Sequence, residues 1–224
     1  SGPEALGGFL QPPAHSPRPW VGRGSKAGRG MFWLVAFLLL GIERFLYGYI
    51  YHFPASFKKT CRSHLKRLVA VDRECYWLVA QHLGVAIKVF QFGVVGYDLV
   101  FRCSVSVPSL WRLCVGAPLL VMGQMLNAAV FKAIGGVGVY YGAQLGYDVP
   151  WHSGFPYNLG IGDPQYWGVV LFVWGVYLTI VADAPSFGGA YLVPWLETFW
   201  YVASMKLLEH KEHGTAVLQG LGML

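Results

Sequence analysis

The residues best suited to ligand chemistry gather in one connector, residues 155–168, between two long apolar stretches. The connector contains two prolines, several aromatic side chains and a single charged residue, Asp163. A solvated linker would carry more charge and fewer aromatic residues. Its side chains that can form hydrogen bonds include Tyr157, Asn158, Tyr166 and Trp167. We therefore expect this connector to form the working or docking surface of the protein.

Metal binding is a second chemistry that the residue types allow, and their spacing does not favour it. His210 and His213 are three residues apart and share a helix face beside Glu209, but no further ligand cluster accompanies them. We interpret this run as a solvated helix end and predict no metal site. The cysteines are scattered, without a Cys-x-x-Cys pair, and so indicate neither zinc nor a disulfide framework. They are Cys61, Cys75, Cys103 and Cys114.

Ionisable residues interrupt the apolar stretches, among them Glu43, Arg44, His82 and Lys88. Adjacent side chains do not face each other on a helix. We therefore expect Glu43 and Arg44 to find separate partners on a neighbouring helix or subunit, or among lipid headgroups. We expect His82 to be a satisfied buried group and Lys88 to extend its ammonium group toward water.

The composition indicates a membrane protein. Of the 224 residues, 55% are hydrophobic and 12% are charged, about half the charged fraction of an average soluble domain. The formal net charge is +6. The basic residues flank apolar stretches, as lipid headgroups and topology rules require, and do not form a stripe interleaved with exposed aromatics. Nucleic acid is therefore not an expected partner.

Five apolar segments approach or exceed the roughly 20 residues that a membrane-spanning helix needs. They are residues 31–51, 75–101, 110–134, 166–182 and 187–208. We predict an all-α integral membrane protein, a bundle of four to five transmembrane helices, over residues 31–213. Residues 1–30 are predicted to form an extended Gly/Pro-rich arm and residues 214–224 a C-terminal tail.

Alternation of the spans brings three features to one membrane face. A basic loop, residues 58–73, is expected to face the cytoplasm or the mitochondrial matrix. The connector and the end of the last span fall on the same face. The aromatic side chains of the connector are therefore predicted to meet Glu209 and His210 there.

The first thirty residues, Ser1 to Gly30, carry four basic residues and one acid, Glu4, without any apolar period. Such a segment cannot pack a core and stays mobile unless something holds it. We expect it to lie on a partner subunit. An arginine-bearing leader poor in acids also suits import into an organelle. The expected location is the mitochondrial inner membrane, with the endoplasmic reticulum as the alternative.

The second half of the chain carries a recognisable pattern. A glycine ladder, Gly138, Gly142 and Gly146, precedes an FPYN run at Phe155 and a DPxYWG run at Asp163. This pattern resembles the phosphatidylethanolamine N-methyltransferase (phospholipid methyltransferase) family, most clearly from about residue 113 to residue 209. The resemblance implies a helical membrane enzyme that moves a methyl group from S-adenosylmethionine to the amine of a phospholipid headgroup. It places the headgroup near Tyr157, Asn158, Tyr166 and Trp167, because aromatic faces receive a methylated ammonium well.

The resemblance also implies a methyl-donor site built from a Gly-x-Gly motif in the third span and a Glu-Glu pair at the end of the last. In this chain the Gly-x-Gly positions hold Val121 and Gly123, and the pair holds Leu208 and Glu209. Each motif is half present, so Gly123 and Glu209 are the predicted cofactor-binding residues. The branched side chain of Val121 would crowd a closely approaching ligand, and Leu208 removes one carboxylate.

Two functions remain open, and no catalytic residue is assigned. We favour a phospholipid methyltransferase-like protein with lost or weakened catalysis that acts as an accessory, lipid-contacting subunit of a larger organellar complex. The alternative is an active S-adenosylmethionine-dependent phosphatidylethanolamine N-methyltransferase, and only that alternative requires S-adenosylmethionine as a cofactor. The predicted partners are phospholipids, the membrane and other protein subunits contacted by Ser1 to Gly30.

Overall fold

The computed structural model describes residues 26–65, 75–182 and 189–209. Apart from an isolated bridge between Val105 and Val181, the regular structure of these residues is helical. The arm before Lys26 and the tail that carries His210 and His213 lie outside the described residues. The described part of the predicted arm, from Lys26 to Gly30, is already helical and forms the start of the first span.

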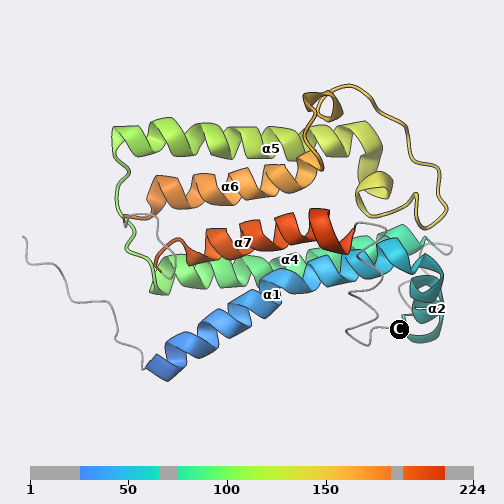
Figure 1. The fold of residues 1–224 in the computed structure, drawn as a ribbon, viewed down its shortest axis with the longest axis horizontal. Coiled ribbons are helices and arrows are strands. Elements are labelled where there is room, and N and C mark those ends of the chain that lie inside the picture. Colours follow the sequence, from blue (N-terminus) through green and yellow to red (C-terminus); the bar gives the residue numbers. More distant parts are fainter. Residues whose placement is uncertain (1–25, 66–74, 183–188, 210–224) are drawn as a thin grey trace, which may run out of the picture.

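Among the described residues, five helices form the bundle. They are α1 (Lys26–His52), α4 (Tyr76–Phe101), α5 (Leu110–Val139), α6 (Pro164–Ile180) and α7 (Leu192–Ala203). Helices α4, α5, α6 and α7 are nearly parallel and α1 is inclined to them (Figure 1). The shorter elements are α2 (Pro54–His64), the 3₁₀ turn η1 (Tyr157–Leu159) and the π-helical turn η2 (Ser204–Leu208). Three of the described helices, α1, α4 and α5, are long and apolar enough to cross a membrane, and α6 is a shorter apolar helix. The predicted all-α membrane fold is therefore confirmed.

The predicted spans lie close to the observed helices, with differences at their ends. The third span continues past Ile134, because α5 bends at Gly135 and runs on to Val139. Gly135 has φ +64°, a left-handed conformation that glycine adopts without steric cost. The bend turns the end of α5 toward the rest of the bundle, as the yellow-green end of this helix shows in Figure 1. It delivers Tyr140 and Tyr141 to the end of the bundle.

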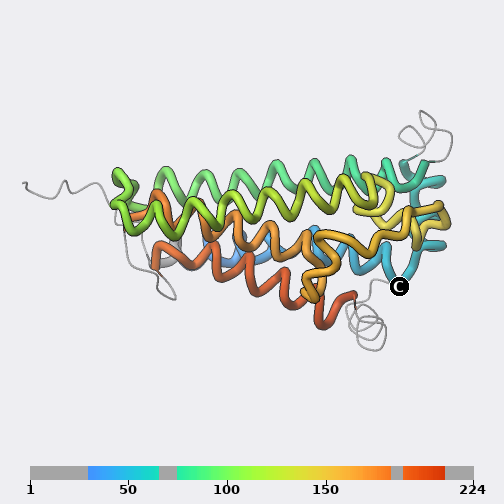
Figure 2. The backbone as a smooth tube through the Cα atoms, turned by 90° about the horizontal axis from the view of Figure 1, so that it is seen from above, coloured from blue at the N-terminus to red at the C-terminus, as the bar shows by residue number. Residues whose placement is uncertain are grey.

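Helices α5 and α6 pack closely because glycines face each other. A Cβ atom on Gly123 would lie 2.5 Å from the carbonyl oxygen of Gly168, and one on Gly175 would lie 2.6 Å from the backbone nitrogen of Leu120. In lipid, small residues at such positions let two helix backbones approach each other. Helices α5 and α6 consequently run side by side along the bundle (Figure 1 and Figure 2).

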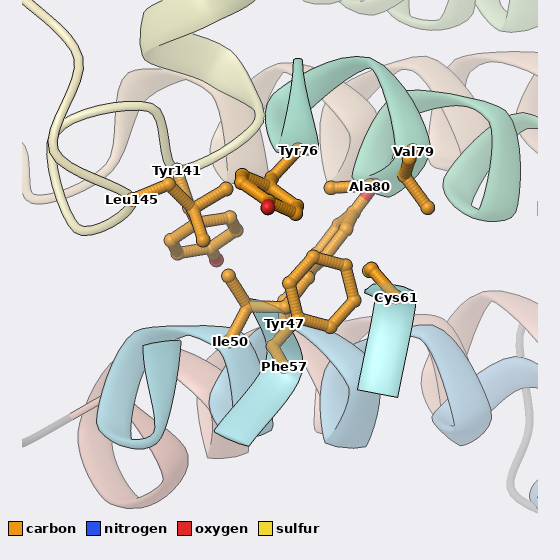
Figure 3. Close-up of a cluster of buried hydrophobic side chains, with 9 residues drawn as sticks. All are labelled: Tyr47, Ile50, Phe57, Cys61, Tyr76, Val79, Ala80, Tyr141 and Leu145. Carbon is orange, nitrogen blue, oxygen red and sulfur yellow. The ribbon is translucent and has the colours of Figure 1, made fainter. Parts of the chain in front are cut away.

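The first part of the basic stretch, residues 58–64, is helical, so its prediction as a loop was wrong for this part; residues 66–73 lie outside the described residues. Phe57 and Cys61 of α2 are buried against Tyr76 and Tyr47 of neighbouring helices. Lys59 and Arg62 stay exposed. Figure 3 shows the apolar side of α2 closing a core cluster at this end of the bundle. The cluster contains Tyr47, Ile50, Phe57, Cys61, Tyr76, Val79, Ala80, Tyr141 and Leu145.

The intramembrane charges also differ from the prediction. Glu43 and Arg44 bind each other, with Arg44 Nη2 2.6 Å from Glu43 Oε2, and both side chains are buried. Lys88 does not extend toward water, because its Nζ lies 2.7 Å from the same Glu43 oxygen. One carboxylate thus offsets two cations inside the bundle, where separate headgroup contacts would require each side chain to reach the surface. Among the described residues, Nε and Nη1 of Arg44 have no hydrogen-bond partner, and the guanidinium lies over tyrosine rings. His82 is exposed rather than buried.

Candidate functional site

A cavity of about 300 Å³ opens at the end of the bundle where α1, α5, α6 and η2 meet the connector. Its volume falls at the lower end of the range of small-molecule pockets. Phenol, amide and carboxyl groups make up the polar part of its wall. These groups belong to Tyr51, Tyr141, Gln144, Tyr157, Asp163, Gln165, Tyr166 and Glu209.

Glu209 is held at this cavity by two hydroxyl groups. Its Oε1 accepts hydrogen bonds from Tyr166 at 2.5 Å and from Ser204 at 2.7 Å. The π-helical turn after α7 brings Ser204 and Glu209 together, since the backbone N–H of Glu209 also bonds to the carbonyl of Ser204. The hydroxyls of Tyr166 and Tyr141 are 2.9 Å apart. Because Tyr166 uses its single proton on Glu209, Tyr141 is the donor in that second bond.

A buried cation supports the back of the site. The guanidinium carbon of Arg44 lies 4.7 Å from the ring centre of Tyr166 and 4.3 Å from that of Tyr201. Cation–π contacts of this kind hold the ring of Tyr166 in place. The first helix thereby fixes the side chain that orients the Glu209 carboxylate.

A second carboxyl group, Asp163, lines the same cavity at the start of α6. It has φ +45° in the left-handed region, which directs the chain from the connector into the helix. Burial in the cavity wall and the nearby charge of Glu209 raise the pKa of Asp163 to about 6, and Arg44 partly offsets this effect. Burial, together with the nearby charge of Glu209, also raises the pKa of Tyr141. The tyrosine therefore stays a neutral donor.

The arrangement suits a cationic ligand. Two carboxyl groups can offset a positive charge, and the aromatic rings beside them present their negative faces to it. An ammonium or a sulfonium group meets both requirements. Among the described residues, no three His, Cys, Asp or Glu side chains are placed to hold a metal ion.

The residues that were predicted to lie near the lipid headgroup do not all lie at the same place in the structure. Tyr157 and Tyr166 line the cavity, together with Glu209 from the end of the last helix. Trp167 lies instead along an apolar groove on the outer side of α5 and α6, and Asn158 is exposed. The predicted meeting of the connector with Glu209 is seen at Tyr166, while His210 lies outside the described residues.

The predicted donor-motif residues also take different positions. Gly123 is buried in the α5–α6 contact and is absent from the residues that line the end cavity. Val121 is 59% exposed and lines the outer groove beside Trp167, so its side chain does not crowd the cavity. Leu208 is 3% exposed, and its carbonyl oxygen lies 2.6 Å from Nε2 of His52. A ligand-binding role for Gly123 stays a prediction.

Five polar residues of the cavity wall were not predicted as site residues: Tyr51, Tyr141, Gln144, Asp163 and Gln165. Asp163 was visible as the single charge of an otherwise uncharged connector, which is a usable signal. Tyr141 is placed by the bend at Gly135 and by its own left-handed φ of 60°, neither of which a hydrophobic pattern reveals.

The fold and the cavity define a class: a multi-helix membrane protein with a cavity lined by carboxyl groups and aromatic rings at one end of the bundle. The sequence profile of the phospholipid methyltransferase family matches residues 111–211. The resemblance to this family seen in the sequence is therefore confirmed for this part of the chain.

A similar protein supports the resemblance to this family over a short part of the chain. Over 54 residues the chain is 43% identical to a phosphatidyl-N-methylethanolamine N-methyltransferase of Arabidopsis thaliana. The match covers 24% of this chain and 32% of that enzyme, so it spans about a third of the relative's length. No solved structure matches the chain.

Proposed function

We propose that this protein is a phospholipid methyltransferase-like membrane protein that keeps a cavity for a cationic group but has lost or weakened methyl transfer. In this proposal it acts as an accessory, lipid-contacting subunit of a larger complex in an organelle membrane, namely the mitochondrial inner membrane. Its ligands are phospholipid headgroups, and S-adenosylmethionine is a cofactor only to the extent that catalysis survives.

The observation that carries the proposal is the environment of Leu208. The family resemblance implies a pair of carboxylates here, and this chain has one hydrocarbon side chain, which is buried. The remaining carboxylate, Glu209, already accepts two hydrogen bonds through one oxygen. A sulfonium donor would therefore lose one of the two charges that the resemblance implies for its site.

The second candidate is an active S-adenosylmethionine-dependent phosphatidylethanolamine N-methyltransferase. The specific observation in its favour is the position of Val121, because a side chain on the outer face leaves the cavity open. Methyl transfer from a sulfonium depends mainly on orientation of donor and acceptor, which a cavity with one carboxylate can still provide.

Restoring the second carboxylate tests the proposal directly. The purified protein is titrated with S-adenosylmethionine and assayed for methyl transfer to phosphatidylethanolamine vesicles. We expect little or no turnover from the natural chain and a gain of at least tenfold in Leu208→Glu. The matched control is Leu208→Gln, because a glutamine side chain has nearly the same shape as glutamate and carries no charge. Ready turnover by the natural chain, with no gain in Leu208→Glu, would establish the active enzyme instead.

The accessory role has a separate test. The protein is isolated from its native membrane in mild detergent, and its partners are identified together with their stoichiometry. Co-purification with a fixed set of subunits, and release after deletion of residues 1–25, support the role. Recovery as a free monomer or self-oligomer from both forms contradicts it. Fractionation of mitochondrial and endoplasmic reticulum membranes tests the location.

A further inference from the structure

A second cavity, of about 350 Å³, lies between α4, α5, α6 and α7, away from the end cavity. Its walls are mainly apolar. They are formed by Phe92, Val95, Val169, Phe172, Val173 and Val176. One wall residue, Phe92, is 61% exposed on the outer face of α4, so the cavity borders on the side of the bundle that faces lipid.

Polar side chains gather at one side of this cavity, among them Lys88 and Glu197. Glu197 is 4% exposed, and among the described residues its Oε2 has no hydrogen-bond partner. A buried polar atom without a partner is costly, so each such atom in a folded protein calls for an explanation. Glu197 lines the cavity, where a bound molecule could satisfy this oxygen.

Lys88 and Tyr177 are already engaged, and the amides of Gln124 and Asn127, which also line the cavity, make no hydrogen bond to Oε2 of Glu197. The three donors of the Lys88 ammonium have three acceptors, at 2.7 Å from Glu43, 3.0 Å from Gln91 and 2.8 Å from the Tyr201 hydroxyl. The hydroxyl of Tyr177, which also lines the cavity, donates to Asp98 at 2.9 Å. The free acceptor therefore points to a donor brought by a ligand.

The depth of the cavity restricts the chemistry of that ligand. Lys88 follows Tyr76 by 12 residues on α4, and Glu197 precedes Glu209 by 12 residues. At about 1.5 Å per residue, these groups lie roughly 18 Å from the end of the bundle that carries the first cavity. The hydrocarbon core of a bilayer is about 30 Å thick, so the site lies near its middle. A phosphate-bearing headgroup would be strongly disfavoured there.

We propose that this cavity binds a neutral lipid with a single hydroxyl head. The hydroxyl group donates a hydrogen bond to Oε2 of Glu197, and the apolar body lies against the valine and phenylalanine walls and leaves the bundle beside Phe92. A sterol and a diacylglycerol share this chemistry. The site is independent of methyl transfer and of the end cavity.

Photo-crosslinking tests the proposal on the full chain in phosphatidylcholine nanodiscs. The probes are a diazirine-bearing sterol and a diazirine-bearing diacylglycerol, and the crosslinked peptides are mapped by mass spectrometry. We expect at least one probe to label the cavity segments of α4 or α6, and excess unlabelled parent lipid to suppress that labelling at least fivefold. The methyl ether of the same lipid, which cannot donate, should leave labelling unchanged. The probe that is suppressed identifies the source of the ligand.

Two variants separate binding from folding. Glu197→Met keeps the length of the side chain and removes the acceptor, so competable labelling should fall at least fivefold. Phe92→Trp narrows the lipid side of the cavity at an exposed position and should also reduce labelling. Its matched control, Phe90→Trp, changes a residue of the same helix that is 65% exposed and does not line the cavity. Labelling that the methyl ether suppresses equally well, or that a phosphatidylcholine probe reproduces at the same peptides, would overturn the proposal.

Discussion

The hydroxyl of Tyr166, at the start of α6, donates a 2.5 Å hydrogen bond to the carboxylate of Glu209, which follows the last helix. The two residues are 43 positions apart in the chain, and the bond fixes the connector to the C-terminal end of the bundle. It also orients the carboxylate that we assign to the cationic ligand.

Removing this hydroxyl should weaken both the fold and the site. In Tyr166→Phe, Glu209 loses a donor and Tyr141 loses its acceptor, and hydrogen bonds to charged groups contribute about 1.5–3 kcal/mol each. We expect a clear fall in melting temperature in detergent and weaker binding of S-adenosylmethionine. Tyr157→Phe makes the same chemical change at a half-buried cavity residue and should have little effect on melting. Equal melting temperatures for the two variants would show that the Tyr166–Glu209 bond is dispensable.

A substitution at Gly123 tests whether the packing of α5 against α6 requires a glycine there. A Cβ atom there would lie 2.5 Å from the Gly168 carbonyl oxygen and 2.7 Å from the Phe172 nitrogen, both on the α6 backbone. Gly123→Ala must therefore push α5 and α6 apart, at a cost of about 1–3 kcal/mol. The control is Gly93→Ala on α4, where a Cβ would meet no atom within 4 Å. Thermal unfolding in detergent measures both variants. Gly123→Ala should melt at a lower temperature than the natural chain, and Gly93→Ala should melt at the same or a slightly higher temperature.

The sequence was sufficient to predict the helix bundle, because membrane spans can be recognised from their length and hydrophobicity. It also predicted that the connector and Glu209 would share one end, since alternation of the spans fixes which ends lie together. Helix α2 was missed because its apolar side is narrow: Phe57 and Cys61 are its buried residues among basic and polar neighbours. Positive charge indicates which side of a membrane a segment faces and does not indicate whether that segment is helical.

The candidate site was predicted only in part, because the sequence does not show which way each side chain points. Val121, Gly123 and Trp167 lie in or near the predicted segments but face the outer groove or the α5–α6 contact. Which side of a helix faces a cavity depends on tertiary packing, and an all-apolar membrane helix gives little periodic signal. The Glu43–Arg44 pair was missed because the helix-neighbour rule describes side chains on an isolated helix. In the bundle, Lys88 and the tyrosine rings position both groups.

The shared carboxylate of Glu43 should contribute strongly to stability. Glu43→Gln removes the carboxylate that the buried Arg44 and the partly exposed Lys88 share, and breaking a buried ion pair costs about 3–5 kcal/mol. Lys88→Gln alone should cost less, because Arg44 remains bound to Glu43. In the double variant the two losses should be less than additive. Additive losses in a double-mutant cycle would mean that the two side chains do not interact.

Asp163 should make ligand binding depend on pH. The pKa of its carboxyl is raised from the usual 3.8 to about 6. At pH 5 the group is therefore about 10% ionised and at pH 7 about 90%. The affinity of the end cavity for a cation should rise as pH increases through about 6, and the titration of S-adenosylmethionine at pH 5 and pH 7 measures this directly. We expect a several-fold gain in the natural chain.

The variant Asp163→Asn isolates this group, because histidines titrate in the same range and asparagine also tolerates the left-handed backbone. Its affinity should vary less with pH than that of the natural chain. The same shift affects stability in the opposite direction. The folded state holds the Asp163 proton more tightly than the unfolded state does, so the free energy of unfolding should fall as pH rises from about 4 to about 6. A melting temperature that changes equally with pH in both proteins would place the Asp163 carboxyl in open solvent and outside the binding cavity.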